Sequence, residues 1–147
     1  MLYSSRGERQ MMTKEQFVQT SPDEFMNEGQ LDFVRQLLMN MRDAANTRSI
    51  EEPGPGGRQA DPIDQAWQEE QWMIRLKRRA QQTDLLTEID KALHRVTTGE
   101  YGYCELSGEP IDVRRLLANP LSRTTVEEQD RLERSQMKHL YYGQNRG

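Results

Sequence analysis

The sequence predicts a mainly α-helical protein in which a long antiparallel coiled-coil hairpin projects from a small globular domain. The first observation is a pair of long helical patterns separated by a dense run of helix breakers. The second is composition: of 147 residues, 34% are hydrophobic and 30% are charged, and the mean hydropathy is −0.97. So little apolar material does not fill one large round core, but it suits helices that share narrow seams.

The N-terminal part leads into the first long helix. Residues 1–26 show no sustained hydrophobic period, so we expect a partly mobile segment with a short helix at residues 14–18. A long helix is then expected over residues 28–49, because Asn27 and Gln30 have the spacing of a capping box. Apolar residues recur along it at alternating intervals of three and four, as in a coiled-coil seam: Leu31, Val34, Leu38, Met41 and Ala45.

The second long helix follows a break. Prolines and glycines at residues 53–57 end the first helix. Asp61 and the proline after it begin the second, since aspartate suits an N-cap and proline the first helical position. No breaker follows until Gly99, which predicts a helix of roughly 50 Å against about 33 Å for the first. We therefore expect the hairpin over residues 27–98, with its tip at about residues 50–66.

The unequal lengths raise the question of how the helices pair. Folding them back about Gly56 would place Ala45 opposite Ala66 and Leu31 opposite about Ala80. The rest of the second helix would then lack a partner in the first. That part holds the richest apolar stripe, which we expect the C-terminal region to cover: Leu85, Leu86, Ile89, Leu93 and Val96.

The C-terminal region, residues 99–142, is expected to form a small domain that ends in a helix. Its sequence indicates a hairpin turning at Ser107–Gly108, a short helix over residues 113–118 and a last helix that begins near Thr125. Residues 143–147 are expected to form a disordered tail.

Charge and composition limit the function. The net charge is −4, with acids and bases mixed along the chain, so direct sequence-specific DNA binding is not expected. The sequence contains no run of 18 apolar residues, so no membrane span is predicted. Cys104 is the single cysteine, which excludes an intramolecular disulfide and is typical of inert packing. We expect a cytoplasmic protein and, without a nucleophile–base pair or phosphate loop, no enzyme.

Asp61 and Asp64 lie one turn apart where the second helix begins. Local chemistry favours an N-cap and a first-turn acid placed by the helix dipole. At the end of a projecting hairpin, the same carboxylates are also placed to approach a metal ion or basic groups of a partner. Two carboxylates are too few for a calcium or magnesium site of their own, so no bound metal is predicted.

Two further features near the tip stay open. Trp67 and Trp72 fit a contact surface and a packing seam equally well. The basic cluster after them is more typical of a solvated helix face than of a phosphate site: Arg75, Lys77, Arg78 and Arg79.

Five short motifs occur in fixed order from residue 61 onward. They are DPIDQA at 61–66, YGYC at 101–104, Gly108, RRL at 114–116 and ANP at 118–120. Together they resemble the DksA/TraR family of bacterial RNA polymerase-binding transcription factors, and the likeness runs from about Phe25 to Lys138.

The resemblance implies a regulator that binds RNA polymerase and does not bind promoter DNA directly; we expect a monomer. Its coiled coil would enter the secondary channel of the polymerase. Asp61, Asp64 and Ala66 would approach the active site, the alanine because a small side chain permits close approach, and Arg115 would hold the polymerase rim. The implied result is an altered lifetime of the open complex and repression of ribosomal RNA promoters in the stringent response, often with the alarmone ppGpp.

The chain departs from the family at the zinc finger. Four cysteines hold zinc in the family, at positions that fall on Cys104, Ser107, Thr125 and Glu128. Hydroxyl groups are poor zinc ligands, so we expect a degenerate zinc finger without zinc. Thr125 and Glu128 have capping-box spacing, and backbone hydrogen bonds are expected to replace the metal at the start of the last helix.

A second departure concerns ppGpp. The family uses basic residues at the positions of Glu88, Asn119 and Gln129, none of which is basic here, while Leu85 matches an apolar contact. Either the protein needs ppGpp less, or a neighbour such as Arg123 or Arg131 compensates.

Two other functions stay open at this point. A Gre-like transcript-cleavage factor would use tip acids to hold magnesium in the same channel, but small segments flank this hairpin on both sides. A plain helical adaptor would dock another coiled coil through its seam and would not need Asp64.

Overall fold

The computed structural model describes residues 11–50 and 61–144. These residues form the helices α1 (Lys14–Gln19), α2 (Glu28–Ile50), α3 (Pro62–Thr98), α4 (Val113–Ala118) and α5 (Val126–Gln144), with a 3-10 turn η1 (Pro22–Glu24) after α1. Within the described ranges no strand forms, and the only β-type pairing is an isolated bridge between Tyr103 and Pro110. The mainly α prediction of a hairpin plus a small domain is confirmed.

Some predictions lie outside the described residues. They are the mobility of residues 1–10, the breaker run at residues 53–57 and the tail over residues 145–147. Residues 143 and 144, predicted to belong to the tail, are part of α5 instead.

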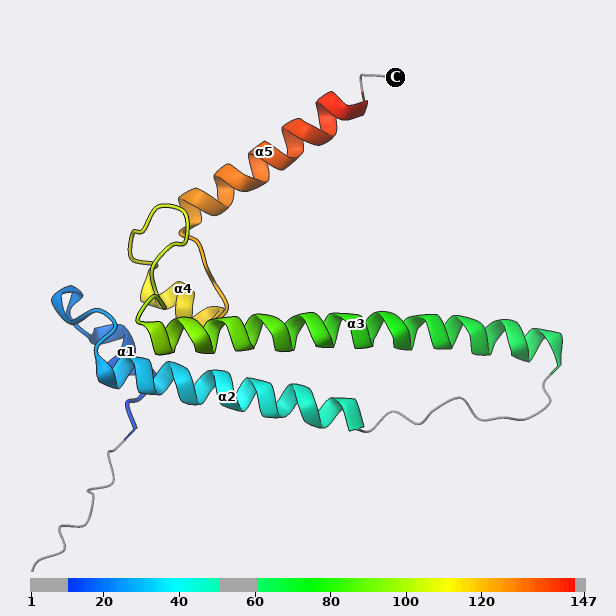
Figure 1. Ribbon diagram of the computed structural model, residues 1–147, viewed down its shortest axis with the longest axis horizontal. Helices are drawn as coiled ribbons and strands as arrows, with labels where there is room; N and C mark the ends of the chain where they lie inside the picture. The colour runs from blue at the N-terminus through cyan, green and yellow to red at the C-terminus, as the bar shows by residue number, and fades with distance from the viewer. Residues whose placement is uncertain (1–10, 51–60, 145–147) are drawn as a thin grey trace, which may run out of the picture.

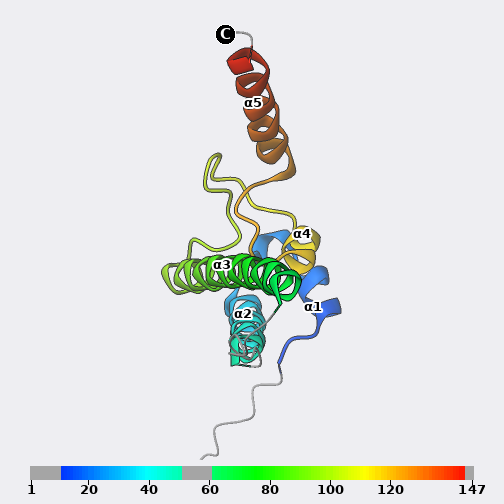
Figure 2. The same cartoon turned by 90° about the vertical axis from the view of Figure 1, so that its right-hand side faces the viewer.

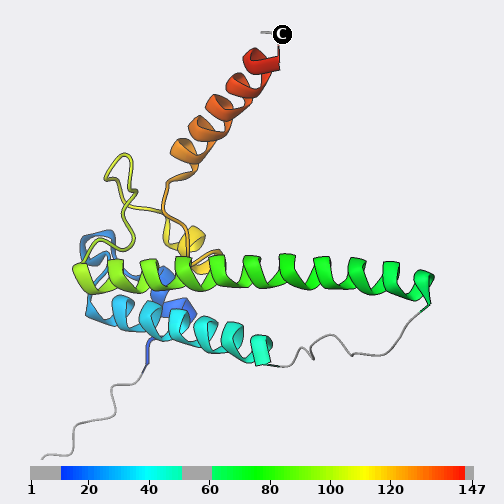
Figure 3. The same ribbon diagram turned by 45° about the vertical axis from the view of Figure 1, so that its right-hand side comes forward.

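Helices α2 and α3 run antiparallel and side by side (Figures 1 and 3). Their shared seam holds Val34 and Leu38 of α2 against Ile89, Ala92 and Val96 of α3, all of which are buried. The core continues into the base of the hairpin, where these residues join it: Phe17, Met26, Tyr101, Cys104, Ile111 and Leu116.

The pairing register predicted for the two helices is wrong, because Ala45 lies beside Gln82 and not beside Ala66. The carbonyl of Ala45 accepts a hydrogen bond from the side-chain amide of Gln82. Arg42 likewise forms an ion pair with Asp90 at 3.7 Å. The register follows the apolar groups, because aligning the seam of α2 with the stripe of α3 buries more surface than a symmetric fold-back. Thus α2, rather than the C-terminal region alone, covers most of that stripe, whereas Leu85 stays exposed.

In this register no helix of the described residues lies beside the first part of α3. Since Ala45 is level with Gln82, the end of α2 at Ile50 is level with about Lys77. We call residues 62–76 of α3 the overhang; it is visible beyond the end of α2 in Figure 1. Large apolar side chains are exposed along it: Ile63, Trp67, Trp72, Met73, Ile74 and Leu76.

Local signals set the helix ends. The Asn27 side chain accepts a hydrogen bond from the N–H of Gln30 at 2.9 Å, as the capping-box spacing predicts. The Gln30 side chain does not return to Asn27. It is buried, accepts from the N–H of Met26 at 2.7 Å and donates to the carbonyl of Phe17 at 3.0 Å. At the far end of α3, Gly99 takes the left-handed conformation with φ 78° and ends the helix.

The base is closed by a contact that requires glycine. Gly102 has φ 89°, and a Cβ atom on it would lie 2.8 Å from Cγ of Met26. The ring of Tyr101 beside it is buried, and its hydroxyl donates to the carbonyl of Pro120 at 2.7 Å. Together these contacts fix the turn after α3 against η1 on one side and the segment after α4 on the other. Helices α1 and α4 lie at this end (Figure 1), and α5 projects away from the base (Figure 2).

Candidate functional site

The structure places Asp61 and Asp64 at the start of α3. Asp61 is the N-cap residue of α3, and its carbonyl accepts the N–H of Gln65 at 2.9 Å. Its carboxylate makes no capping hydrogen bond, so it is not used to hold the helix start. Asp64 lies in the first turn, and both acids and Ala66 are exposed. Two carboxylates therefore face outward at the end of the overhang, far from the core.

Asp61 and Asp64 are not joined by a third metal-binding side chain among the described residues. No group of three or more His, Cys, Asp or Glu side chains arranged to bind a metal occurs within residues 11–50 and 61–144. Asp61 and Asp64 are suited instead to add oxygen ligands to an ion that a partner already holds, or to meet its basic groups.

At the base, three of the four positions that the family resemblance matches to zinc ligands meet around one sulfur atom. Cys104 is buried. Its sulfur receives hydrogen bonds from the side chain and N–H of Ser107 and from the N–H groups of Thr125 and Leu106. Burial raises the pKa of the Cys104 thiol, but these four hydrogen bonds outweigh it and lower the pKa to about 7. Hydrogen-bond donors directed at the Cys104 sulfur thus hold together the turn that contains Ser107.

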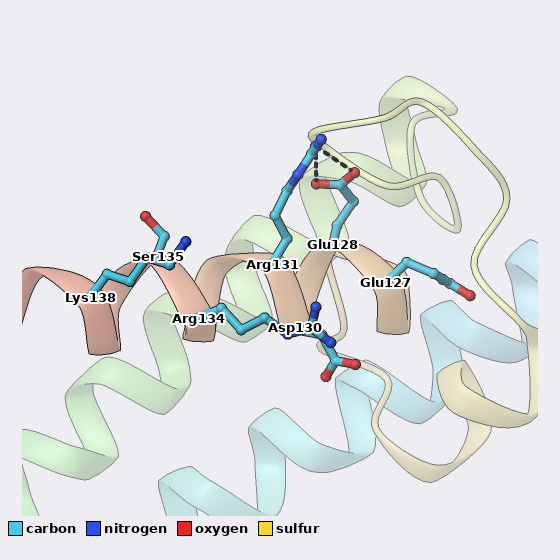
Figure 4. A pocket seen from close by; sticks show the side chains of 7 residues that line it. All are labelled: Glu127, Glu128, Asp130, Arg131, Arg134, Ser135 and Lys138. Atoms are coloured by element: carbon cyan, nitrogen blue, oxygen red, sulfur yellow. Dashed lines mark hydrogen bonds and ion pairs between the residues drawn. The ribbon is translucent and has the colours of Figure 1, made fainter.

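Half of the predicted capping box at the start of α5 is present. The Thr125 hydroxyl accepts from the N–H of Glu128 at 3.4 Å. The reciprocal bond does not form, because the Thr125 N–H is directed to Cys104. The Glu128 carboxylate instead forms an ion pair with Arg131 at 3.2 Å, drawn in Figure 4.

These residues do not fit a tetrahedral zinc ion. Zinc sites use thiolate, imidazole or carboxylate donors. Here Cys104 supplies one sulfur that is already hydrogen-bonded on several sides, Ser107 and Thr125 supply hydroxyls, and Glu128 is turned to Arg131.

The environment of Cys104 predicts a pH dependence of stability. The thiol has an ordinary pKa of 9.0 and a folded pKa of about 7, so the unfolded chain binds more protons between these values. The free energy of unfolding is expected to rise as the pH increases from about 7 to about 9, and the stabilisation is lost as the pH falls through 7. Urea unfolding at several pH values measures this. Cys104→Ser is expected to flatten the curve in that window; an unchanged slope in the variant would contradict the assignment.

A second candidate site lies between the base and the hairpin. A cleft of about 490 Å³ separates α3 from the segments around α4 and α5. Arg115 enters it from α4, and its Nε donates to the carbonyl of Thr124 at 3.1 Å. Within the part of the chain that the structure describes, Arg115 has no carboxylate partner. The cleft is also lined by the three residues that the family resemblance matches to ppGpp contacts: Glu88, Asn119 and Gln129.

The cleft contains a chain of charges that sequence reasoning missed. Arg123 lies 3.7 Å from Glu88 and 3.9 Å from Glu105. Glu105 in turn accepts from Arg95 at 3.2 Å. Lys91 hydrogen-bonds Glu88 and, with Arg123, lowers the pKa of that carboxyl. Arg123 was visible in the sequence as a cation near this site, but nothing local indicated that two acids hold it.

No helix among the described residues is long and apolar enough to cross a membrane.

Fold and candidate sites together define a helical-hairpin protein with an acidic tip, remote from a base built on a zinc-finger-like turn. Comparison with known proteins gives the family. The pattern of the prokaryotic dksA/traR C4-type zinc finger matches residues 99–134. The RNA polymerase-binding transcription factor DksA of Caulobacter vibrioides is 35% identical over 133 residues, covering 88% of this chain and 94% of that protein.

Two further relatives agree. The RNA polymerase-binding transcription factor DksA of Escherichia coli (strain K12) is 32% identical over 109 residues, covering 71% of this chain and 72% of that protein. The solved structure of the transcription factor DksA2 from Pseudomonas aeruginosa aligns with a TM-score of 0.72 and 33% identity, covering 84% of this chain and 98% of that one. The chain belongs to the DksA/TraR family.

Proposed function

We propose that this protein is an RNA polymerase-binding transcription factor that works through the polymerase secondary channel. Two relatives named for polymerase binding, one of them aligned over 94% of its length, support the partner. The single observation that supports the mode of action is the overhang with free carboxylates at its end. A long helix that carries Asp61 and Asp64 far from the base of the hairpin has a suitable shape to place them inside a narrow channel of a partner protein.

The hairpin and the base then have separate tasks. Residues 27–98 insert, and residues 99–142 hold the hairpin at the channel entrance. Asp61 and Asp64 act on the polymerase active site, and Ala66 permits close approach. Arg115 contacts the polymerase rim, a role that its half-buried position and lack of a carboxylate partner in the described residues support. The expected outcome is a shorter-lived open complex and repression of ribosomal RNA promoters.

The test uses the whole protein with core polymerase, sigma factor and a ribosomal RNA promoter. Binding to core polymerase and a shortened open-complex lifetime are both expected. Binding without any effect on the open complex would favour an adaptor instead, and stimulated cleavage of a backtracked transcript would favour a Gre-like role. Failure to bind polymerase would overturn the proposal.

We also propose that the base folds without zinc. Hydrogen bonds around Cys104, the Thr125 cap and the buried core replace the metal. A cap contributes only about 1 kcal/mol, so most of the stability has to come from the core around Ile111 and Leu116. Metal analysis of tag-free protein is expected to find no stoichiometric zinc, and a chelator is expected to leave the helical circular dichroism signal unchanged. One zinc per chain, or unfolding by the chelator, would exclude this.

We further propose that Glu88 weakens the response to ppGpp. Glu88 lies where the family places a cation, and it engages Arg123 and Lys91. Glu88→Ala removes an acid and frees both cations, and a hydrogen bond to a charged group is worth about 1.5–3 kcal/mol. The variant is expected to increase the effect of ppGpp on promoter inhibition by on the order of 10-fold.

Inhibition is measured with and without ppGpp. Asp84→Ala, on an exposed turn of the same helix, is the matched control and is expected to behave as wild type. An equal gain in both variants would mean that overall charge, rather than the cleft, is responsible.

A further inference from the structure

The overhang carries two exposed tryptophans that the proposed function does not use. Trp67 is 63% exposed and Trp72 is 41% exposed, although tryptophan is highly buried on average. Helix α2 does not reach them, because it ends level with about Lys77. Exposed rings of this size are characteristic of contact surfaces, where one large flat side chain supplies much of the contact area.

Each tryptophan shares a face of α3 with an arginine. Trp72 and Arg79 are seven residues apart, and Trp67 and Arg78 are eleven apart. At 3.6 residues per turn, each pair lies within about 20° around the helix axis. The separations along the axis are about 10 Å and 16 Å. Each of the two pairs therefore places one indole ring and one guanidinium group on the same face of α3.

The cations at this position are not neutralised. Lys77, Arg78 and Arg79 are all exposed, and none forms an ion pair with a carboxylate of residues 11–50 or 61–144. Some exposed cations elsewhere in the described residues do have acidic partners, although Arg114, Arg134 and Lys138 do not. Arg35, Lys91 and Arg131 are each paired with an acid three residues away: Asp32, Glu88 and Glu128.

We infer that residues 67–79 of α3 bind single-stranded RNA. Aromatic side chains stack on unpaired bases of any sequence, and neighbouring cations follow the phosphates. An acidic peptide would use the cations but not the two rings, whereas a duplex keeps its base faces covered. The acids toward the tip, Asp64, Glu69 and Glu70, keep phosphates at the basic end. This inference goes beyond the proposed function, since it is a property of the free protein.

The chain itself supplies the probe. Its two tryptophans are the only ones it has, so tryptophan emission excited selectively, apart from the tyrosines, reports on this surface alone. A fluorescein-labelled oligouridylate of about 12 nucleotides is titrated with the whole protein at low salt. Rising anisotropy and quenched tryptophan emission are expected together. Trp72→Ala is expected to weaken binding by about 10-fold or more.

Charge variants separate phosphate contact from general attraction. The triple variant Lys77→Gln, Arg78→Gln, Arg79→Gln is expected to lower the slope of log affinity against log salt by about 2. The matched control changes three cations on α5, whose side chains appear in Figure 4: Arg131→Gln, Arg134→Gln, Lys138→Gln. This control is expected to bind as wild type.

Several results would overturn the inference. They are an absence of saturable binding, equal affinity for duplex RNA, and equal losses in the α3 and α5 triple variants. If the α3 triple variant loses affinity for polymerase while no form of the protein binds the oligonucleotide, the surface contacts protein instead. Because polymerase binding and oligonucleotide binding are measured separately, failure here leaves the proposed function standing.

Discussion

Asp64→Asn is expected to abolish the effect on ribosomal promoters while polymerase binding stays within about twofold of wild type. The substitution removes one negative charge and leaves the size of the side chain unchanged. Asp64 is exposed in the first turn of α3 and contacts no core residue. Loss of its favourable position at the helix start costs only about 0.3–1 kcal/mol, so the fold survives and the defect is confined to the tip.

The measurement pairs open-complex lifetime with affinity for core polymerase. Asp84→Asn makes the same chemical change at another exposed position of α3 and is expected to retain full activity. If Asp64→Asn retains its promoter effect, the tip carboxylate is not the acting group. If it loses polymerase affinity as strongly as activity, Asp64 serves binding instead.

Helix boundaries could be predicted from the sequence because their signals are local. Asn27 places the start of α2, the proline at residue 62 suits the first position of α3, and Gly99 ends that helix. Each signal acts through backbone groups within one turn, so no knowledge of the fold is required. The grouping of Asp61 and Asp64 at the start of α3 was predictable for the same reason, since the two residues are neighbours in sequence.

The pairing register was not predictable from a symmetric turn. It depends on which apolar groups meet across two helices, and the chain between Ile50 and Asp61 is long enough to allow more than one alignment. Only the dense stripe around Ile89 favours the observed one. The stripe itself is evident in the sequence. The sequence does not show whether α2 or the C-terminal region packs against it.

The cleft around Arg115 was beyond sequence reasoning for a related reason. Its charge chain joins Glu88, Glu105 and Arg123, which come from three separate segments. The missing half of the cap at Thr125 has the same origin, because its N–H is taken by the sulfur of Cys104, twenty-one residues earlier in the sequence. Local spacing identifies a group able to form a bond, whereas tertiary contacts decide which partner it meets.

Leu38→Ala is expected to lower the free energy of unfolding by about 2–5 kcal/mol. Leu38 is fully buried in the seam of α2, within the same core cluster as Ile89 and Val96 of α3. The substitution removes apolar contacts and leaves a cavity that two long helices do not readily close. Because the seam between α2 and α3 is narrow, few other buried contacts hold the two helices together. We therefore expect this truncation to have the largest effect on stability of any in the hairpin.

Urea unfolding followed by circular dichroism measures the change, with an unaltered m-value showing that the same structure unfolds. Leu76→Ala is the matched control: it deletes the same atoms from the overhang, where Leu76 is 41% exposed. Its cost is expected to stay below about 1 kcal/mol. An equal loss in the free energy of unfolding at the two positions would mean that the overhang is packed as tightly as the seam. The tip would then not be freely accessible to a partner.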